Sequence, residues 1–165
     1  ILAARKHGIE VEIIPGISSA VAVPASLMIP LTCRGIAESF WVTTGTTRSG
    51  DISGDIELAA RSTATVVILM AMSKLEGIMQ IFERHGKRNT PVAIIQEGTT
   101  SRQKMITGTV HDIALRAEAA GMANPAIIVV GEVVEIQGVL AGAGKQVLQF
   151  FKPANIPAAS SRSKW

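Results

Sequence analysis

The clearest chemical feature of the sequence is a turn that carries two neighbouring hydroxyl groups. Pro15 and Gly16 follow an apolar run and precede Ser18 and Ser19, after which small residues continue to about Met28. This order predicts a strand, a tight turn and the first turn of a helix, where free backbone amides and hydroxyls can bind a polar ligand group. The alternative is that the two serines only cap the helix, which is the commoner role for serine at this position.

Other patterns of catalytic residues are missing. The sequence contains no Gly-x-Ser-x-Gly elbow and no Walker lysine loop, and neither a carboxylate pair nor a Cys–His pair stands out. Cys33 is the single cysteine, and it has no Cys or His companion at metal-ligand spacing. We therefore expect neither hydrolase nor nucleotide-triphosphatase chemistry, and no metal site.

The charge balance favours an anionic partner. Sixteen Lys and Arg residues against 13 Asp and Glu residues give a net charge of +3, and the basic residues are scattered along the chain. Such a balance suits an anionic small ligand as well as a nucleic acid. Aromatic residues make up only 4% of the chain and Tyr is absent, so base-stacking platforms are hard to assemble. We therefore expect no nucleic-acid partner.

The overall composition predicts a folded chain outside the membrane. Hydrophobic residues account for 47% and charged residues for 18%, which is typical of a globular protein with a substantial core. The longest apolar stretch, from Val66 to Met72, is far shorter than the roughly 20 residues of a membrane-spanning helix. Because no charged-then-apolar signal region opens the chain, we expect a cytoplasmic protein.

Strands that alternate with helices must position these residues. The β-rich and apolar runs predict strands over residues 11–14, 39–44, 65–70, 91–95, 104–107 and 126–130, the last extended beyond a bulge by Val133, Val134 and Ile136. Helices are expected to end before Gly8, to run from Ser18 or Ser19 to Met28, from Ser73 to His85 with Glu76 completing a capping box, and from about 109–112 to Ala120. The fold class is therefore α/β, an α/β sandwich on a mixed sheet with a tight antiparallel return at Gly98 to Ser101.

A polar segment and an irregular tail complete the chain. Residues 46–54 are rich in Gly, Ser, Thr and Asp, which predicts a mobile loop that acts as a lid or is disordered. After Gln137 the pattern dissolves into a tail rich in Ala, Gly, Ser and Pro that carries Phe150, Phe151 and Trp165.

An ordered series of short motifs resembles a known enzyme family. The motifs are Pro15 to Ala20, Ile29 to Gly35, Thr43 to Gly45, Leu69 to Met72, Thr90 to Ala93, Glu97 to Thr99 with Gln103, and Pro125 to Val134. Their order and spacing resemble the uroporphyrinogen III C-methyltransferases, tetrapyrrole methylases that use S-adenosylmethionine. The resemblance covers about Gly8 to Ile136, which is most of the chain.

The resemblance implies a two-domain α/β enzyme, usually a homodimer, that binds S-adenosylmethionine between its domains. It methylates two carbons of uroporphyrinogen III to give precorrin-2, on the way to sirohaem or cobalamin. This chain resembles the second, C-terminal domain of the tetrapyrrole methylase fold. On that basis residues 1–9 are a remnant of the first domain and linker, residues 10–137 the C-terminal domain, and residues 138–165 a poorly determined tail.

The resemblance also implies a cofactor site of six residues: Ser18, Ser19, Met70, Gly98, Pro125 and Ala126. Met70 would pack its flexible thioether against the cofactor, and the small residues would let the backbone approach it closely. The structural alternatives are a core methionine, a turn glycine and a strand entry. Relatives carry Gly where this chain has Ala71, so the added methyl is expected to crowd the approach of the ligand.

The substrate implied by the resemblance carries several carboxylates. Arg34 is the candidate substrate-binding residue, because a guanidinium can hold a carboxylate through two hydrogen bonds. The alternative is a solvated arginine after a turn. Arg102 and Lys104 beside Gln103 offer similar contacts.

Catalysis of this kind depends on geometry. A pyrrole carbon of a porphyrinogen is already electron-rich, so orientation relative to the methyl group should outweigh acid–base catalysis. The glycine-rich loop and aspartate motif of the family's first domain are missing from these residues. We therefore expect the chain alone to be inactive and the same sequence extended upstream to be active. The alternatives are a methylase of a later precorrin, which the motifs at Pro15 and Pro30 disfavour, or a non-catalytic half-domain that dimerises or binds a tetrapyrrole.

Overall fold

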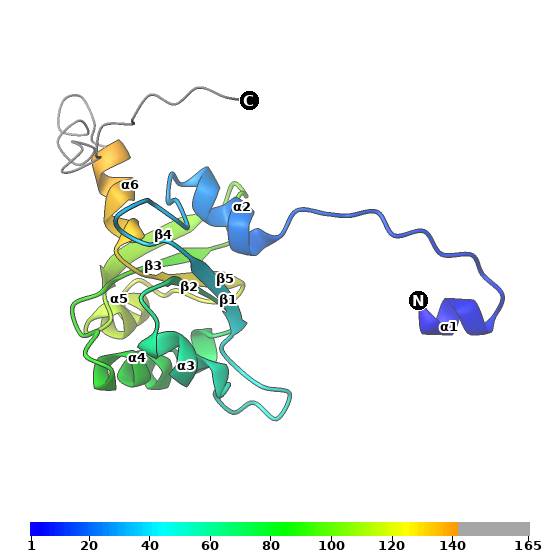
Figure 1. Ribbon diagram of the computed structural model, residues 1–165, viewed down its shortest axis with the longest axis horizontal. Helices are drawn as coiled ribbons and strands as arrows, with labels where there is room; N and C mark the ends of the chain where they lie inside the picture. Colours follow the sequence, from blue (N-terminus) through cyan, green and yellow to red (C-terminus); the bar gives the residue numbers. More distant parts are fainter. Residues whose placement is uncertain (142–165) are drawn as a thin grey trace, which may run out of the picture.

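Five runs rich in β-branched residues form the strands of one mixed sheet in the computed structural model, which describes residues 1–141 (Figure 1). The strands are β1 (Phe40–Thr44), β2 (Thr65–Leu69), β3 (Pro91–Gln96), β4 (Lys104–Thr109) and β5 (Ala126–Val130). Their order across the sheet is β1-β2-β5-β3-β4. β1 and β2 are parallel, and every other neighbouring pair is antiparallel. This arrangement confirms the predicted mixed sheet.

Helices cover both faces of the sheet, which makes a three-layered α/β sandwich (Figure 1). One face carries α2 (Ser19–Ser26) and α6 (Val133–Ala141), and the other carries α3 (Asp55–Arg61), α4 (Leu75–Arg84) and α5 (Ile113–Ala119). A short 3₁₀ turn, η1 (Met72–Lys74), leads into α4, and α1 (Leu2–Lys6) lies away from the sheet at the end of an extended segment. Within residues 1–141, no helix is long and apolar enough to cross a membrane.

The two cores follow from the alternation of side chains along each strand. Val66 and Ile68 of β2 pack into the core under α3, α4 and α5, where Phe82 is fully buried. Val67 points to the opposite face and packs with Val133 of α6 and with side chains of α2. Because helices cover both faces, the central strands are apolar at successive positions, as predicted.

Most of the predicted elements are confirmed to within two residues. β5 has the predicted bounds, β1 and β2 each differ by one residue, and β3 and β4 extend one and two residues further than expected. The antiparallel return between β3 and β4 is also confirmed. α4 ends one residue before His85, as expected for a helix that closes ahead of Gly86, whose φ is +77°.

The strand predicted over residues 11–14 is wrong. This segment is extended, but it pairs with no strand among residues 1–141 and runs away from the sheet (Figure 1). Ile13 and Ile14 are 71% and 82% exposed. A β-rich sequence forms a strand only where a neighbouring strand accepts its backbone hydrogen bonds. α2 is also shorter than predicted, because it ends at Ser26 ahead of Met28, whose φ is +60°.

The capping box predicted at Ser73 is wrong as well. α4 begins at Leu75, its N-cap is Lys74, and no side chain caps it. Ser73 lies inside η1, where the N–H of Lys74 donates to the carbonyl of Ala71 at 3.0 Å. The chain therefore enters α4 through a 3₁₀ turn that contains Ser73, so Ser73 is not the N-cap of the helix.

The third wrong element is the extension of the last strand. Residues after Gly131 form α6, and Val133, Val134 and Ile136 are buried against the face of the sheet that α2 covers. Gly131 has φ of +150°, a conformation that lets the chain leave β5 sharply. Valine and isoleucine favour strands by propensity, but burial of this apolar face outweighs that preference.

Two further segments differ from expectation. α3 was not predicted, although Ile56, Ala59 and Ala60 have the helical spacing of its buried face. Residues 46–54 form a folded-back loop, in which Thr46 and Ile52 make an antiparallel bridge, so the structure does not show the disordered alternative. Residues 138–141 of the predicted tail belong to α6, and the remainder of the tail, including its aromatic residues, lies outside the described residues.

A carboxylate at the start of α5 gives a first testable prediction. Hydrogen bonds from Thr109 and then Arg116 hold the pKa of Asp112 below its ordinary value, and the Thr109 N–H donates to Oδ1 at 2.6 Å. Asp112→Asn is expected to lower the free energy of unfolding by about 1 kcal/mol at pH 7.

The effect of Asp112→Asn should depend on pH in one direction. A depressed pKa in the folded state means that the stabilising contribution is complete above roughly pH 4 and is lost as the pH falls through the folded-state value. The difference between the wild type and the variant, measured by urea unfolding at several pH values, should therefore shrink at acid pH. A difference that stays constant down to pH 3 would contradict this.

Candidate functional site

Most of the predicted site residues meet in one cleft at one end of the sheet, where its inner strands begin or end. Five residues that are far apart in the sequence line this cleft: Ser19, Met70, Gly98, Pro125 and Ala126. The ends of β2 and β3 meet the start of β5 here because β5 runs antiparallel to both of its neighbours. The cleft has a volume of about 660 Å³, which is in the range of small-molecule sites.

The floor of the cleft is apolar and was not predicted. Leu69, Ile95 and Ile127 come from three adjacent strands, and Val23 of α2 contributes one wall. Leu69, Ile95 and Ile127 lie within runs whose sequence is typical of ordinary core strands. Only the order of the strands in the sheet, which the sequence does not reveal, places these three residues side by side.

Met70 lies on the rim with an unusual backbone conformation. It follows β2 with φ of +52°, its side chain is 62% exposed, and its carbonyl accepts a hydrogen bond from the Thr46 hydroxyl at 3.1 Å. A second hollow of about 390 Å³ lies beside it, lined also by Ser73 and Asn124. Met70, Pro125 and Ala126 line both hollows, so Met70 lies at their boundary. A left-handed non-glycine residue costs on the order of 1–3 kcal/mol and often marks a functional site.

The turn after β3 also has non-glycine residues in the left-handed backbone conformation. Glu97 and Thr99 have φ of +47° and +67°, and the turn is held by its own side chains. The Thr100 hydroxyl donates to the Glu97 carbonyl at 2.8 Å, and the Gln103 side chain accepts from the Thr99 N–H at 2.7 Å. Glu97, Thr100 and Arg102 all line the cleft. The sequence offers Arg102 as an anion contact, whereas it does not single out Glu97 and Thr100, although both lie within two residues of the predicted Gly98.

Gly98 is small for a reason that involves α2. A Cβ atom at this position would lie 2.4 Å and 2.7 Å from the two methyl carbons of Val23. Gly98 therefore lets α2 pack closely against the turn, and this close packing sets the width of the cleft. The approach of a ligand to Gly98 stays a prediction.

Ser18 caps α2. Its side chain accepts a hydrogen bond from the Ala20 N–H at 3.3 Å, which satisfies one of the free amides of the first turn. Ser19 lines the cleft instead, and its hydroxyl makes no hydrogen bond within residues 1–141. The capping role therefore belongs to one serine and the exposed hydroxyl to the other.

This division of roles gives a second prediction. Ser18→Ala is expected to lower the free energy of unfolding by about 1 kcal/mol, because the cap is lost. Ser19→Ala should change it by less than about 0.5 kcal/mol, since no bond within the described chain is removed. Thermal or urea unfolding of the two variants tests this. Equal losses would show that Ser18 does not act as the cap.

Two sequence expectations change with the geometry. Arg34 does not line the cleft: it is exposed in the turn between Cys33 and Ala37, so its substrate role stays a prediction. The methyl of Ala71 does not face either hollow, because Ala71 is buried in the core and packs against Gly45. The expectation that this methyl crowds a ligand is therefore wrong, since the methyl of Ala71 lies against the backbone of Gly45, which has no side chain.

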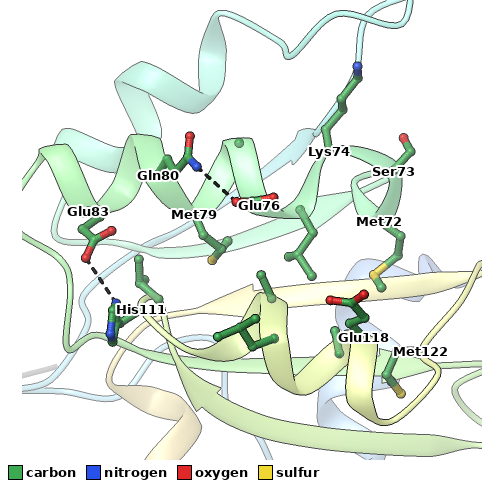
Figure 2. Close-up of a pocket in the computed structure, with 16 residues that line it drawn as sticks. Met72, Ser73, Lys74, Glu76, Met79, Gln80, Glu83, His111, Glu118 and Met122 are labelled. Atoms are coloured by element: carbon green, nitrogen blue, oxygen red, sulfur yellow. Dashed lines mark hydrogen bonds and ion pairs between the residues drawn. The ribbon is translucent and has the colours of Figure 1, made fainter.

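A second large hollow, between α4 and α5, lacks all of the predicted residues (Figure 2). It measures about 670 Å³, and its carboxylates are already engaged or spread along its walls. Figure 2 shows Glu83 reaching His111 at 3.4 Å and Gln80 donating to Glu76, while Glu118 lies apart on α5. No group of three or more possible metal ligands occurs within residues 1–141.

The opposite end of the sheet carries two charged residues, Lys87, which is partly buried, and Glu132, which is exposed. Burial lowers the pKa of Lys87 and raises the pKa of Glu132. The Lys87 ammonium donates to the Ser62 carbonyl at the end of α3 and lies 5.8 Å from the centre of the Phe82 ring. These contacts join α3 to the loop before β3 and give Lys87 a structural role.

Known proteins share both the sequence and the fold. The family model for Tetrapyrrole (Corrin/Porphyrin) Methylases matches residues 1–114, the N-terminal part of this chain. The uroporphyrinogen-III C-methyltransferase of Methanocaldococcus jannaschii is 44% identical over 138 residues, which is 82% of this chain and 57% of the relative. The siroheme synthase of Methylobacillus flagellatus is 38% identical over 82% of this chain and 29% of its own length.

A solved structure gives the same result. The crystal structure of uroporphyrin-III C-methyl transferase from Thermus thermophilus complexed with S-adenyl homocysteine has a TM-score of 0.66 and 27% identity, over 82% of this chain and 58% of that one. The chain thus spans little more than half the length of the methyltransferases it matches. These matches confirm the family. They do not confirm the prediction that the chain is the C-terminal portion of a family member. With its mixed sheet and the match over residues 1–114, the chain belongs to the tetrapyrrole methylase family.

Proposed function

We propose that this chain contributes the cofactor cleft of an S-adenosylmethionine-dependent methyltransferase that acts on uroporphyrinogen III. One observation carries the proposal: five of the six residues that the family resemblance implies for the cofactor line a single cleft. They come from four separate segments of the chain, and neither composition nor local spacing requires them to meet. The names of the M. jannaschii and T. thermophilus relatives support the same reaction.

The residues of the cleft suit such a cofactor. The apolar floor of Leu69, Ile95 and Ile127 matches a planar base, while the Ser19 hydroxyl and the polar turn after β3 offer partners for hydroxyl and amine groups. The related T. thermophilus structure is complexed with S-adenyl homocysteine, the compound that remains after methyl transfer. We infer that Ser18, Ser19, Met70, Gly98, Pro125 and Ala126 form one wall of the cofactor site.

The chemistry asks the protein mainly for positioning. When bound, the cofactor would supply a methyl group from its sulfonium, and the electron pair of the broken C–S bond would stay on sulfur. The pyrrole carbon that takes the methyl already carries a side chain and would become quaternary, and the ring N–H would release the balancing proton. The residues of this chain hold the donor and exclude water from the apolar floor. Glu97 is the one carboxylate among the cleft-lining residues, and Arg102 is bonded to it, so orientation is the main contribution.

The finer assignments are also proposals. We infer that two such transfers give precorrin-2 for sirohaem or cobalamin synthesis, that Arg34 contacts a substrate carboxylate, and that the complete protein is a cytoplasmic homodimer. The second candidate function is a half-domain that binds cofactor or tetrapyrrole without turnover.

Two measurements test these proposals. Calorimetry of the 165-residue chain with S-adenosylmethionine should give saturable binding, and a folded chain that binds neither this compound nor S-adenosylhomocysteine would contradict the proposed cleft. Methyl transfer to uroporphyrinogen III should be undetectable for the chain alone and present in a longer form that restores the remaining length of the relatives. Product mass spectrometry then separates uroporphyrinogen methylation from methylation of a later precorrin. Methyl transfer by the chain alone would contradict the proposal that this chain forms just one wall of the cofactor site.

A further inference from the structure

Glu97 holds a fixed position at the end of the central strand β3. Its N–H donates to the carbonyl of Pro125 at 2.9 Å, which continues the pairing of β3 with β5 by one residue. The next turn then bends away with Glu97 in the left-handed region, at φ of +47°. The position is therefore set by backbone contacts on both sides, and the side chain is directed by a strained but well-supported main chain.

The carboxylate of Glu97 is only partly satisfied. Its side chain is 18% exposed and borders the apolar floor of the cleft. Oε2 accepts a hydrogen bond from Arg102 Nε at 2.6 Å, whereas Oε1 has no partner within residues 1–141. Oε1 is not among the enclosed polar atoms that lack a partner, so it faces open space and has free capacity to accept a hydrogen bond from a ligand donor.

Arg102 orients this carboxylate. The Arg102 side chain is 76% exposed, but its backbone N–H donates to the Thr100 hydroxyl at 3.1 Å, and that hydroxyl donates to the Glu97 carbonyl. The Glu97 carboxylate and the Arg102 guanidinium therefore belong to one short turn, which has its own internal hydrogen bonds. Because the Arg102 side chain is mostly in solvent, this ion pair adds little to stability, and a role in binding gives a better account of its position.

The surroundings of Glu97 indicate the chemistry of its partner. A flat apolar floor favours a planar ring, and a carboxylate oxygen beside it accepts a hydrogen bond from a hydroxyl or an amine. A nucleoside carries both features. We propose that Glu97 is a specificity-determining residue of the cleft, whose Oε1 accepts a hydrogen bond from a ribose hydroxyl or from the base amine of the adenosyl group. This inference rests on the proposed function.

The test compares Glu97 with a matched acidic residue. Calorimetry of the full 165-residue chain with S-adenosylhomocysteine should show at least tenfold weaker binding for Glu97→Ala, because a hydrogen bond to a charged group is lost. Glu97→Gln keeps an acceptor and should recover part of the loss. Glu118→Ala removes the same charge on α5, away from the cleft, and should bind within about twofold of the wild type. Wild-type affinity for Glu97→Ala would overturn the inference.

Ligand analogues separate a direct bond from an effect on the turn. Adenosine, 2′-deoxyadenosine, 3′-deoxyadenosine and purine riboside, which lacks the amine, each omit at most one donor. The analogue that lacks the donor bonded to Glu97 should bind the wild type and Glu97→Ala equally well, because variant and analogue remove the same bond. An equal loss for every compound would mean that Glu97 only shapes the turn, which overturns the inference.

The two levels of proposal fail in different ways. A wild-type chain that binds none of these compounds contradicts the proposed function itself. A wild-type chain that binds S-adenosylhomocysteine while Glu97→Ala binds it equally well contradicts only the role of Glu97. An amide NMR spectrum of each variant confirms that the fold is intact before affinities are compared.

Discussion

Replacing Gly45 by Ala is expected to lower the free energy of unfolding by about 3 kcal/mol, at the upper end of the usual cost of overpacking. A Cβ atom at this position would lie 2.5 Å from the Cβ of Ala71 and 2.7 Å from its Cα, both far inside contact distance. Gly45 follows β1 and its N–H donates to the Leu69 carbonyl at 2.7 Å, so it cannot move away without breaking the edge of the sheet. Urea unfolding measures the loss.

Two companion variants show whether the clash is the cause. Gly16→Ala adds the same methyl where nothing lies within 4 Å and where φ is not positive, and it should change stability by less than about 0.5 kcal/mol. Gly45→Ala combined with Ala71→Gly should recover part of the loss, because the Cα of residue 71 still lies 2.7 Å from the new methyl. Full recovery, or no loss for Gly45→Ala alone, would contradict the close approach of these two segments.

Gly98→Ala is expected to cost about 2 kcal/mol of stability and to weaken binding of S-adenosylhomocysteine. The new methyl would overlap both methyl groups of Val23, and relief requires α2 to move away from the turn after β3. Because α2 carries Ser19 into the cleft, that shift widens the site as well as loosening the core. Unfolding and calorimetry on one protein sample separate the two effects.

A double-mutant cycle makes the Gly98 prediction specific. Val23→Ala alone loses packing, but it removes both atoms that lie within 3.0 Å of the new methyl and leaves the Val23 Cβ at 3.1 Å. Gly98→Ala in that background should therefore cost little, with an interaction energy of at least about 1 kcal/mol. Additive costs would refute the proposal that Gly98 is small because of Val23.

The site residues could be predicted where they lie in short sequence motifs. Ser19, Met70, Gly98, Pro125 and Ala126 each lie in a segment whose order along the chain resembles the family, and the structure brings all five together. The resemblance to the family selected these residues, and turn chemistry gives local support only to Ser19, Gly98 and Pro125, because serine, glycine and proline are typical of turns. Their contact with a cofactor stays a prediction. The pairing partners of strands carry no such local signature.

The failures share one physical cause, which is competition from tertiary contacts. Val133 and Val134 favour a strand by propensity, yet they are buried on a helix that covers the sheet. Ser73 fits a capping box, yet it lies inside a 3₁₀ turn and Lys74 is the N-cap of α4. Glu97 reads as a turn residue, and only the pairing of β3 with β5 shows that its carboxylate borders the apolar floor. Local sequence cannot report contacts that depend on strand order.

The position of β5 between β2 and β3 has a consequence for how the chain acquires its structure during synthesis. Within residues 1–141, β2 pairs with β1, β3 pairs with β4, and the two halves are joined as a sheet through β5, whose Val130 is aligned with both Val66 and Val92. Until residue 130 leaves the ribosome, the nascent chain holds two separate ribbons with open edges. The last strand to emerge both joins them and completes the cleft, so folding of the core and assembly of the site should be one cooperative event.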